Sequence, residues 1–211
     1  MRRRGRFVVL EGLDGAGTTT QSRLLGERLR ADGRRVHVTA EPSGGPVGAL
    51  VRQVLTHRVA GPGGGVDPAA MALLFAADRL DHVSAEIAPR VLKGVDVVSD
   101  RFTLSSLAYQ GVTTDDMGWV EVVNARAALP DVTIFLEVRP AVAFARRKAA
   151  SDAPELYEVS AFQRKVAKSY ARALERIQAS GQHVVVLDGE RPVEEVARAV
   201  HRAVLELDRR S

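Results

Sequence analysis

A glycine-rich segment after a short apolar run is the part of the chain best suited to chemistry. The run Phe7 to Glu11 is followed by Gly12-Leu13-Asp14-Gly15-Ala16-Gly17-Thr18-Thr19-Thr20. In the P-loop pattern G-x-x-x-x-G-K-[ST], backbone N–H groups surround phosphate oxygens and the last hydroxyl binds Mg²⁺. Gly12, Gly17 and Thr19 match that pattern. The combination of strand, spacing and hydroxyl favours a nucleotide phosphate site over an ordinary glycine-rich turn.

Thr18 stands where the pattern has lysine, so this loop lacks its own cation. A P-loop lysine reaches the terminal phosphates as a point charge. By analogy with other charge stabilisers, its loss costs on the order of 3 kcal/mol in the transition state. Two interpretations follow: another cation replaces the lysine, or the chain is a poor or inactive catalyst. The first is favoured because the rest of the site is complete.

Arg146 and Arg147 are the candidate replacements. They lie at the edge of Ala149 to Glu158, a segment that interrupts two helical stretches and suggests a mobile lid at about residues 146–158. A cluster of cations is usually a solvated surface. Phosphoryl transfer, however, depends on charge neutralisation, and an arginine carried by a closing lid would supply it.

Further candidate residues follow the apolar runs Val36 to Thr39 and Val95 to Ser99. Others lie on a predicted helix between these two runs. Phe75 and Arg79 are four residues apart, so they share one face of that helix. Each motif also has a structural interpretation: a surface turn, a core phenylalanine with a surface ion pair, or an Asp-Arg ion pair. The candidates for substrate or metal contact are Glu41, Pro42, Arg52, Phe75, Arg79, Asp100, Arg101, Ser105, Tyr109 and Gln110.

Five apolar segments predict the strands that position these residues. They are rich in Val, Ile and Phe and are bounded by turn signals. The segments are Phe7 to Glu11, Val36 to Thr39, Val95 to Ser99, Val132 to Glu137 and His183 to Leu187. Helical patterns lie between them, including Leu25 with Leu29 and a periodic run from Val193 to Leu207. The alternation predicts an α/β fold, a mostly parallel five-stranded sheet with helices on both faces, whose ligands bind at the carboxyl ends of the strands.

The composition narrows the class of protein. With 211 residues, 45% of them hydrophobic, the chain fits one domain over residues 1–211. The net charge of +4 is dispersed along the sequence. A basic run interleaved with aromatic residues would predict a nucleic-acid partner, and the sequence has none. There is no cysteine, no membrane-length apolar run and no signal-peptide pattern. We therefore expect a cytoplasmic protein without a membrane partner.

Taken in order, the motifs resemble the thymidylate kinase family over nearly the whole chain. The resemblance rests on Glu11 to Gly17 with Thr20-Gln21, on Glu41-Pro42, on Leu74 to Arg79, and on Asp100 to Phe102 with Ser105-Ser106 and Tyr109 to Gly111. It implies a P-loop kinase fold and ATP- and Mg²⁺-dependent phosphorylation of dTMP to dTDP, a step of dTTP biosynthesis. It also implies direct in-line transfer and a homodimer.

The resemblance implies individual roles as well. Asp14 approaches the deoxyribose 3′-hydroxyl and Phe75 stacks on thymine, while Arg79 and Arg101 grip the dTMP phosphate. Tyr109 lies against the sugar and excludes a 2′-hydroxyl, Gln110 faces the base edge, and Asp100 with Thr19 serves Mg²⁺. Gly15 occupies a position where some members carry a catalytic arginine, so this chain is similar to members that use a lid arginine.

The chain departs from the family pattern at Thr18, at Phe102, where tyrosine is common, and at Glu155 to Glu158, where an Asp-Arg pair is common. Two other functions stay open. One is a kinase for another pyrimidine monophosphate; the other is a non-catalytic protein that binds dTMP or ATP. A GTPase switch is disfavoured because the guanine-reading Asn-Lys-x-Asp motif is absent.

Overall fold

The computed structural model describes residues 4–60, 64–150 and 157–207. Its centre is a five-stranded sheet in the order β2-β3-β1-β4-β5, with every neighbouring pair parallel. The strands are β1 (Phe7–Gly12), β2 (Val36–Ala40), β3 (Asp96–Asp100), β4 (Val132–Glu137) and β5 (Val184–Asp188). All five predicted strands and the α/β class are confirmed; the ends of β4 are as predicted, and those of the other strands differ by at most one residue.

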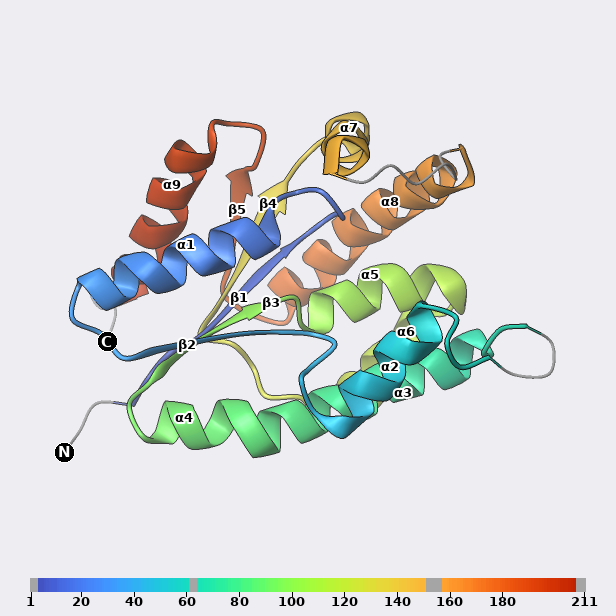
Figure 1. The fold of residues 1–211 in the computed structure, drawn as a ribbon, viewed down its shortest axis with the longest axis horizontal. Coiled ribbons are helices and arrows are strands. Elements are labelled where there is room, and N and C mark those ends of the chain that lie inside the picture. The colour runs from blue at the N-terminus through green and yellow to red at the C-terminus, as the bar shows by residue number, and fades with distance from the viewer. Residues whose placement is uncertain (1–3, 61–63, 151–156, 208–211) are drawn as a thin grey trace.

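Helices cover both faces of the sheet, as Figure 1 shows. The helical elements are α1 (Thr18–Ala31), α2 (Pro46–Leu55), α3 (Pro68–His82), the π-helix η1 (Val83–Ile87), α4 (Ala88–Leu92), α5 (Thr103–Thr113), α6 (Met117–Asn124), α7 (Pro140–Ala150), α8 (Tyr157–Ala179) and α9 (Val193–Glu206). Helices α1 and α9 lie together on one side, and α4, α5 and α8 lie on the other (Figure 1). Among the described residues, no helix is long and apolar enough to cross a membrane.

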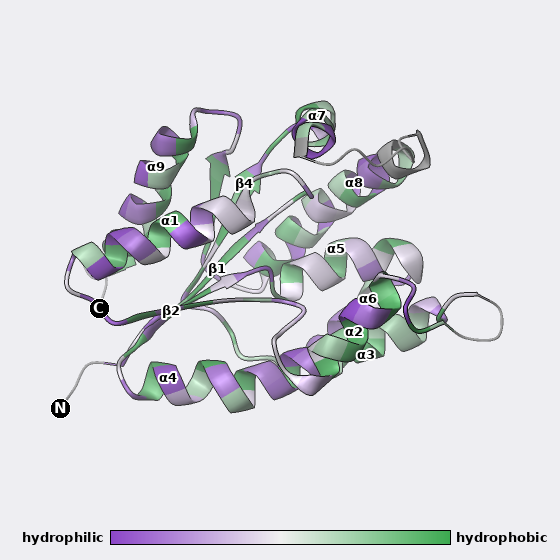
Figure 2. Ribbon diagram, in the orientation of Figure 1, coloured by the Kyte–Doolittle hydropathy of each residue, from purple (hydrophilic) through white to green (hydrophobic). Residues whose placement is uncertain are grey.

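Successive residues of the central strand face opposite layers of the core. Val8 and Leu10 pack in the cluster that contains Leu25 and Leu29 of α1, and all four side chains are at most 1% exposed. Phe7 and Val9 pack with residues of η1, α4 and β3 in a second cluster. Both faces are therefore apolar, as a doubly covered parallel sheet requires. The strands are accordingly hydrophobic in Figure 2, whereas α1 and α9 also carry hydrophilic residues.

The strand order brings the carboxyl ends of β1 and β3 together. Leu10 pairs with Asp100, and Gly12 pairs with Leu136 of β4 on the other side. The glycine-rich loop that follows β1 is thus flanked by the ends of two other strands. This is the edge at which open α/β sheets bind ligands.

Parts of the predicted loops fall outside the described residues. Residues 61–63 and residues 151–156 of the expected lid are among them, and so are the side chains of residues 150 and 157–160. The described portion of the lid region consists of the end of α7 and the start of α8.

Candidate active site

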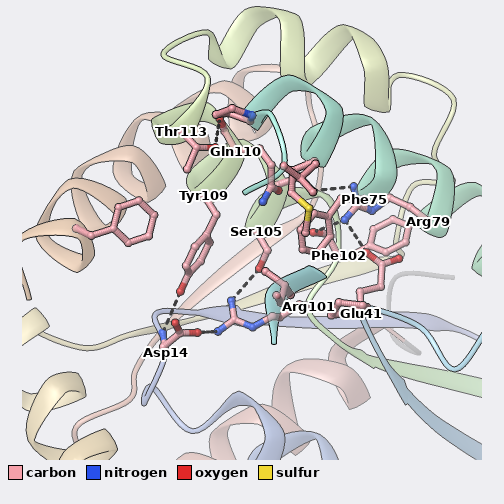
Figure 3. Close-up of a pocket in the computed structure, with 17 residues that line it drawn as sticks. Asp14, Glu41, Phe75, Arg79, Arg101, Phe102, Ser105, Tyr109, Gln110 and Thr113 are labelled. Carbon is pink, nitrogen blue, oxygen red and sulfur yellow. Dashed lines mark hydrogen bonds and ion pairs between the residues drawn. The ribbon is translucent and has the colours of Figure 1, made fainter. Parts of the chain in front are cut away.

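A pocket of about 460 Å³ opens beside the glycine-rich loop and extends away from it (Figure 3). One end carries charged and hydroxyl groups, and the other carries aromatic rings. The lining residues are Asp14, Glu41, Pro42, Leu55, Val66, Pro68, Met71, Phe75, Arg79, Arg101, Phe102, Ser105, Ser106, Tyr109, Gln110, Thr113 and Phe162. Nine of the ten residues predicted for substrate contact, a set that includes Asp14 but not the metal candidate Asp100, line the pocket; Arg52 does not.

The loop between β1 and α1 has the backbone of a phosphate cradle. Gly15 and Gly17 adopt φ of 92° and 95°, a region that other residues enter only with strain. Gly17 caps α1, and no side chain caps the helix, so its first N–H groups are free to face an anion. Gly15 is also required by packing, because a Cβ there would lie 2.2 Å from the carbonyl oxygen of Ala143 in α7.

Thr18 is only 5% exposed, so its side chain is turned into the protein. A Cβ added at Gly12 would lie 3.4 Å from the Thr18 methyl carbon Cγ2. The methyl group therefore packs under the loop. A threonine side chain is short and uncharged, so Thr18 cannot bring a point charge to the terminal phosphates as a lysine would.

Asp14 is the centre of a charged cluster at the loop. Its Oδ1 accepts a 2.7 Å hydrogen bond from Arg101, and its Oδ2 accepts one of 3.0 Å from Gln163. The Arg147 guanidinium lies 3.7 Å from the same Oδ2. One carboxylate thus connects the end of β3, helix α7 and helix α8 at the mouth of the loop.

Arg101 adopts φ of 73°, a strained conformation for an arginine. Its N–H donates to Leu10 O, and its guanidinium donates to Asp14 and to Ser105 Oγ at 3.0 Å. The guanidinium also lies over the Tyr109 ring, 5.4 Å from the centroid. The strain is therefore maintained by several bonds that aim one cation at the pocket.

Glu11 supports this arrangement from below. Its buried carboxylate accepts hydrogen bonds from the N–H groups of Phe102 and Ser105, the Ser105 hydroxyl and the Tyr170 hydroxyl. Burial raises the pKa of Glu11 to about 6, although Arg101 and these donors oppose the rise. The Tyr170 hydroxyl also bonds Gly12 O, so α8 is tied to the strand that carries the loop.

Thr19 and Asp100 meet at the position predicted for Mg²⁺. The Thr19 hydroxyl donates to Asp100 Oδ2 at 2.5 Å. Asp100 Oδ1 is buried and has no hydrogen-bond partner among the described residues. Oxygen ligands suit Mg²⁺, which binds through one or two protein groups together with phosphates and water. The residues present therefore fit the ion.

The distal end of the pocket is aromatic. Phe75 and Phe102 both line it, and Figure 3 shows the two rings near Arg79 and away from Asp14. The Arg79 guanidinium lies 5.1 Å from the Phe102 centroid. It is 1% exposed and bonds Glu41, Ser106, the Phe102 carbonyl and Asn124.

These contacts bear on the predicted roles of the two acceptor-site arginines. Arg79 forms a buried ion pair with Glu41, at 2.6 Å, rather than a surface pair. It is separated from Arg101 along the pocket (Figure 3). The two guanidinium groups therefore do not form one clamp in this structure, and Arg101 is the one beside the phosphate loop.

Tyr109 and Gln110 extend from α5 into the same pocket. The Tyr109 hydroxyl lies 3.3 Å from the N–H of Asp14, from which it accepts. Burial raises the pKa of Tyr109 to about 12, so the phenol is neutral at physiological pH. Gln110 is 8% exposed and lies farther from the loop (Figure 3).

The two candidate lid arginines point to different places. Arg146 donates to the carbonyls of Gly189 and Glu190, in the loop after β5. Arg147 lies over the glycine-rich loop, with its Cγ 3.1 Å from a Cβ built on Gly15. Neighbouring residues on a helix diverge by about 100°, so α7 can present only one of them to the loop.

Arg52 is a predicted substrate contact that the structure places elsewhere. It is exposed, and its guanidinium donates to the carbonyls of Pro42 and Ser43. It therefore braces the turn after β2, whose Glu41 and Pro42 line the pocket. Thr20, in the first turn of α1, is exposed.

Gln163 and Tyr170 are site residues that the sequence reasoning missed. They are seven residues apart on α8, with Val166 between them on the same buried face. The signal in the sequence was that both polar residues occupy helix positions whose spacing places them on the buried, otherwise apolar face. Gln163 Oε1 is buried without a partner among the described residues, so only its amide nitrogen is engaged, by Asp14.

Comparison with known proteins agrees with this geometry. A family model described as thymidylate kinase matches residues 10–200. A probable thymidylate kinase of Pyrobaculum aerophilum is 43% identical over 195 residues, covering 92% of this chain and 93% of the relative. One of Pyrococcus horikoshii is 38% identical over 82% of this chain and 84% of its own. A thymidylate kinase of Bifidobacterium longum is 37% identical over 96% and 98%.

Proposed function

The chain belongs to the thymidylate kinase family, and from this premise we propose that it transfers the γ-phosphoryl group of ATP to dTMP. One observation carries the proposal beyond the family. A single pocket joins a phosphate-binding loop to a slot lined by aromatic rings, with Arg101 at the loop end. A nucleoside monophosphate has this polarity: an anion at one end and a flat base at the other.

The acceptor binds with its phosphate toward Arg101, at the loop end, and its base toward Phe75. An arginine provides paired donors for phosphate oxygens, and an aromatic face stacks on a base. Arg79, at the base end, has N–H donors that favour a carbonyl oxygen over an amino group on the pyrimidine edge. This orientation gives Arg79 a role in base recognition and assigns the phosphate to Arg101.

The donor ATP lies on the loop, where N–H groups of residues 12–18 and the start of α1 face its phosphates. Thr19 and Asp100 would hold Mg²⁺, which neutralises charge on the transferring phosphoryl group when bound. A phosphate oxygen of dTMP attacks the γ-phosphorus in line, and the bond from that phosphorus to the bridging oxygen breaks as ADP leaves. The described side chains bind and orient the two nucleotides without a covalent enzyme intermediate. The reaction is thus dominated by positioning and charge.

Arg147 supplies the charge that Thr18 cannot. Its guanidinium already lies beside Asp14, and its Cγ lies beside Gly15, whose missing side chain leaves room for α7 to approach. Because it is 39% exposed, it is free to exchange Asp14 for a phosphate oxygen. Arg146 faces the loop after β5 and is therefore assigned to support of that loop.

A homodimer is consistent with the surface of α3 and its neighbours. Leu73, Ala77 and Leu80 form an exposed stripe at helical spacing on α3, with the two leucines 49% and 40% exposed. Leu50 of α2 and Val122 of α6 are also exposed, at 39% and 71%. An apolar stripe of this kind is typical of interfaces between copies of a chain.

The test of the proposal is turnover with a panel of acceptors. ADP release is measured with ATP, Mg²⁺ and dTMP, dUMP, dCMP or UMP, beside Thr18→Lys and an Arg101→Ala control that reports contaminating activity. The proposal predicts dTMP-dependent turnover by the natural chain. Preference for another pyrimidine would instead identify a different kinase. No turnover, with activity restored in Thr18→Lys, would favour the non-catalytic nucleotide-binding protein.

A further inference from the structure

A buried chain of polar side chains continues from the pocket into the protein. Arg79 donates to Glu41 Oε2 at 2.6 Å, and Glu41 Oε1 lies 3.3 Å from His82 Nδ1. The side chains of Arg79, Glu41 and His82 are 1%, 2% and 0% exposed. Three ionisable side chains that are buried away from water are stable there only when each has a hydrogen-bonding or charged partner.

This row of hydrogen-bonded side chains continues from His82 to the protein surface. His82 Nε2 lies 2.9 Å from Thr39 Oγ1 and 3.6 Å from Glu86 Oε1. Glu86 in turn is 2.6 Å from His37 Nε2, on β2, and both of these side chains are partly exposed. Burial alone would raise the pKa of Glu86, but hydrogen bonds from His37 and Thr39 and the nearby histidines lower it below its usual value.

The backbone is irregular next to His82, where α3 meets the π-helix that carries Glu86. Helix α3 ends at His82 and passes directly into the π-helix η1, Val83–Ile87, which carries Glu86. A π-turn widens the helix by one residue and is found mostly where a side chain must be aimed. Here it accompanies the approach of Glu86 to both His82 and His37.

We propose that His82 is a positioning residue for base recognition, acting through Glu41 on Arg79. The inference rests on the function proposed above. A carboxylate only accepts hydrogen bonds, so the nitrogen facing Glu41 must carry a proton, and Nδ1–H is the donor. With Glu41 fixed on one oxygen by His82, its other oxygen holds Arg79 at the distal end of the pocket.

Two amide variants separate this role from simple filling of space. Asparagine places its amide nitrogen near the position of Nδ1, so His82→Asn keeps a donor for Glu41. Glutamine places its amide near Nε2, so His82→Gln keeps a polar group facing Thr39 and Glu86 and leaves Glu41 without a donor. The matched control is His201→Asn, because His201 also pairs with a carboxylate, Asp32, far from the pocket.

The experiment measures dTMP affinity by calorimetry without ATP, together with kcat, both KM values and the dTMP over dCMP preference. Because a buried group that loses its partner costs about 1–3 kcal/mol, His82→Gln should weaken dTMP binding by roughly 5- to 150-fold. Its preference for dTMP over dCMP should fall as well, with the KM for ATP unchanged. His82→Asn and His201→Asn should stay within about threefold of the natural chain on the same scale.

Two results would overturn the inference. One is His82→Gln with unchanged dTMP affinity; the other is equal loss in both amide variants, which would mean that His82 only packs. Thermal unfolding of each variant shows that a loss of affinity occurs in folded protein. If the natural protein binds and phosphorylates dTMP but the two His82 variants behave alike, only this inference is refuted and the proposed function stands. Failure of the natural chain to act on dTMP refutes the proposed function.

Discussion

Replacing Arg147 by alanine should remove the cation that stands in for the P-loop lysine. The guanidinium is 3.7 Å from Asp14 Oδ2, and the Cγ of the same side chain lies beside Gly15, 3.1 Å from the position that a Cβ there would take. At about 4 Å and an effective dielectric constant of about 20, one charge pair is worth about 4 kcal/mol. Removal of a single transition-state donor in other enzymes costs about 3 kcal/mol, or roughly 10²- to 10³-fold in kcat. We therefore expect kcat of Arg147→Ala to fall by about 10²-fold or more.

The assay is single-turnover formation of dTDP at saturating ATP and dTMP, which reports transfer rather than product release. Arg146→Ala is the matched control, because it deletes the same side chain from the neighbouring position. Its guanidinium bonds Gly189 and Glu190, so we expect its rate of transfer to stay within about threefold of the natural rate, less than 1 kcal/mol. Thr18→Lys added to Arg147→Ala should recover at least part of the loss.

Two outcomes would refute this reasoning. One is an Arg147→Ala variant that transfers at the natural rate. The other is a large loss in Arg146→Ala with none in Arg147→Ala, which would assign the role to the other arginine. If Thr18→Lys raises the natural rate but adds nothing to Arg147→Ala, the two cations do not act on the same charge.

Three further predictions follow from the described contacts. Phe75→Ala should raise the KM for dTMP by roughly tenfold, since a stacked base is worth about 1–3 kcal/mol, with the KM for ATP unchanged; an unchanged dTMP KM would place the base elsewhere. Because burial raises the pKa of Glu11 from 4.5 to about 6, the free energy of unfolding should fall by about 2 kcal/mol as the pH rises from below 4.5 to above 6. That pH-dependent component should vanish in Glu11→Gln. If urea titrations gave the same pH dependence of the unfolding free energy for both proteins, the prediction would be contradicted. Leu80→Asp on α3 should yield monomers in sedimentation equilibrium; a dimer that persists would exclude this face.

The strands and the phosphate loop followed from the sequence because local patterns specify them. Apolar runs such as Val132 to Glu137 need burial on both faces, and only a covered parallel sheet provides it. The glycines of the loop have a fixed spacing because the backbone itself binds phosphate. Helix α1 begins at Thr18, directly after the last glycine of the loop.

The roles of the arginines depend on packing that spacing does not encode. On sequence grounds Arg79 was equally compatible with a surface ion pair and with ligand binding. Its burial against Glu41 results from the docking of α3 beside the end of β2. In the same way, the choice between Arg146 and Arg147 depends on the approach of α7 to Gly15, a contact between residues 128 positions apart in the case of Ala143.

Polar residues on α8 were missed because their partners come from distant segments. Gln163 binds Asp14 and Tyr170 binds Glu11 and Gly12, each across about 150 residues. A helical pattern shows that such residues face inward, but not which group awaits them. The polar network through His82 has this character in part, since Thr39 of β2 and Glu41 just after it lie 43 and 41 residues before His82, whereas Glu86 lies one helical turn away.

The most direct measurement is transfer of label from [γ-³²P]ATP to dTMP by the natural chain, resolved by chromatography. The account predicts labelled dTDP that forms only with dTMP and Mg²⁺ present and is lost in Arg101→Ala. Binding of both nucleotides without any labelled dTDP would contradict it. In that case Thr18 would mark a site that holds its nucleotides but does not transfer phosphate.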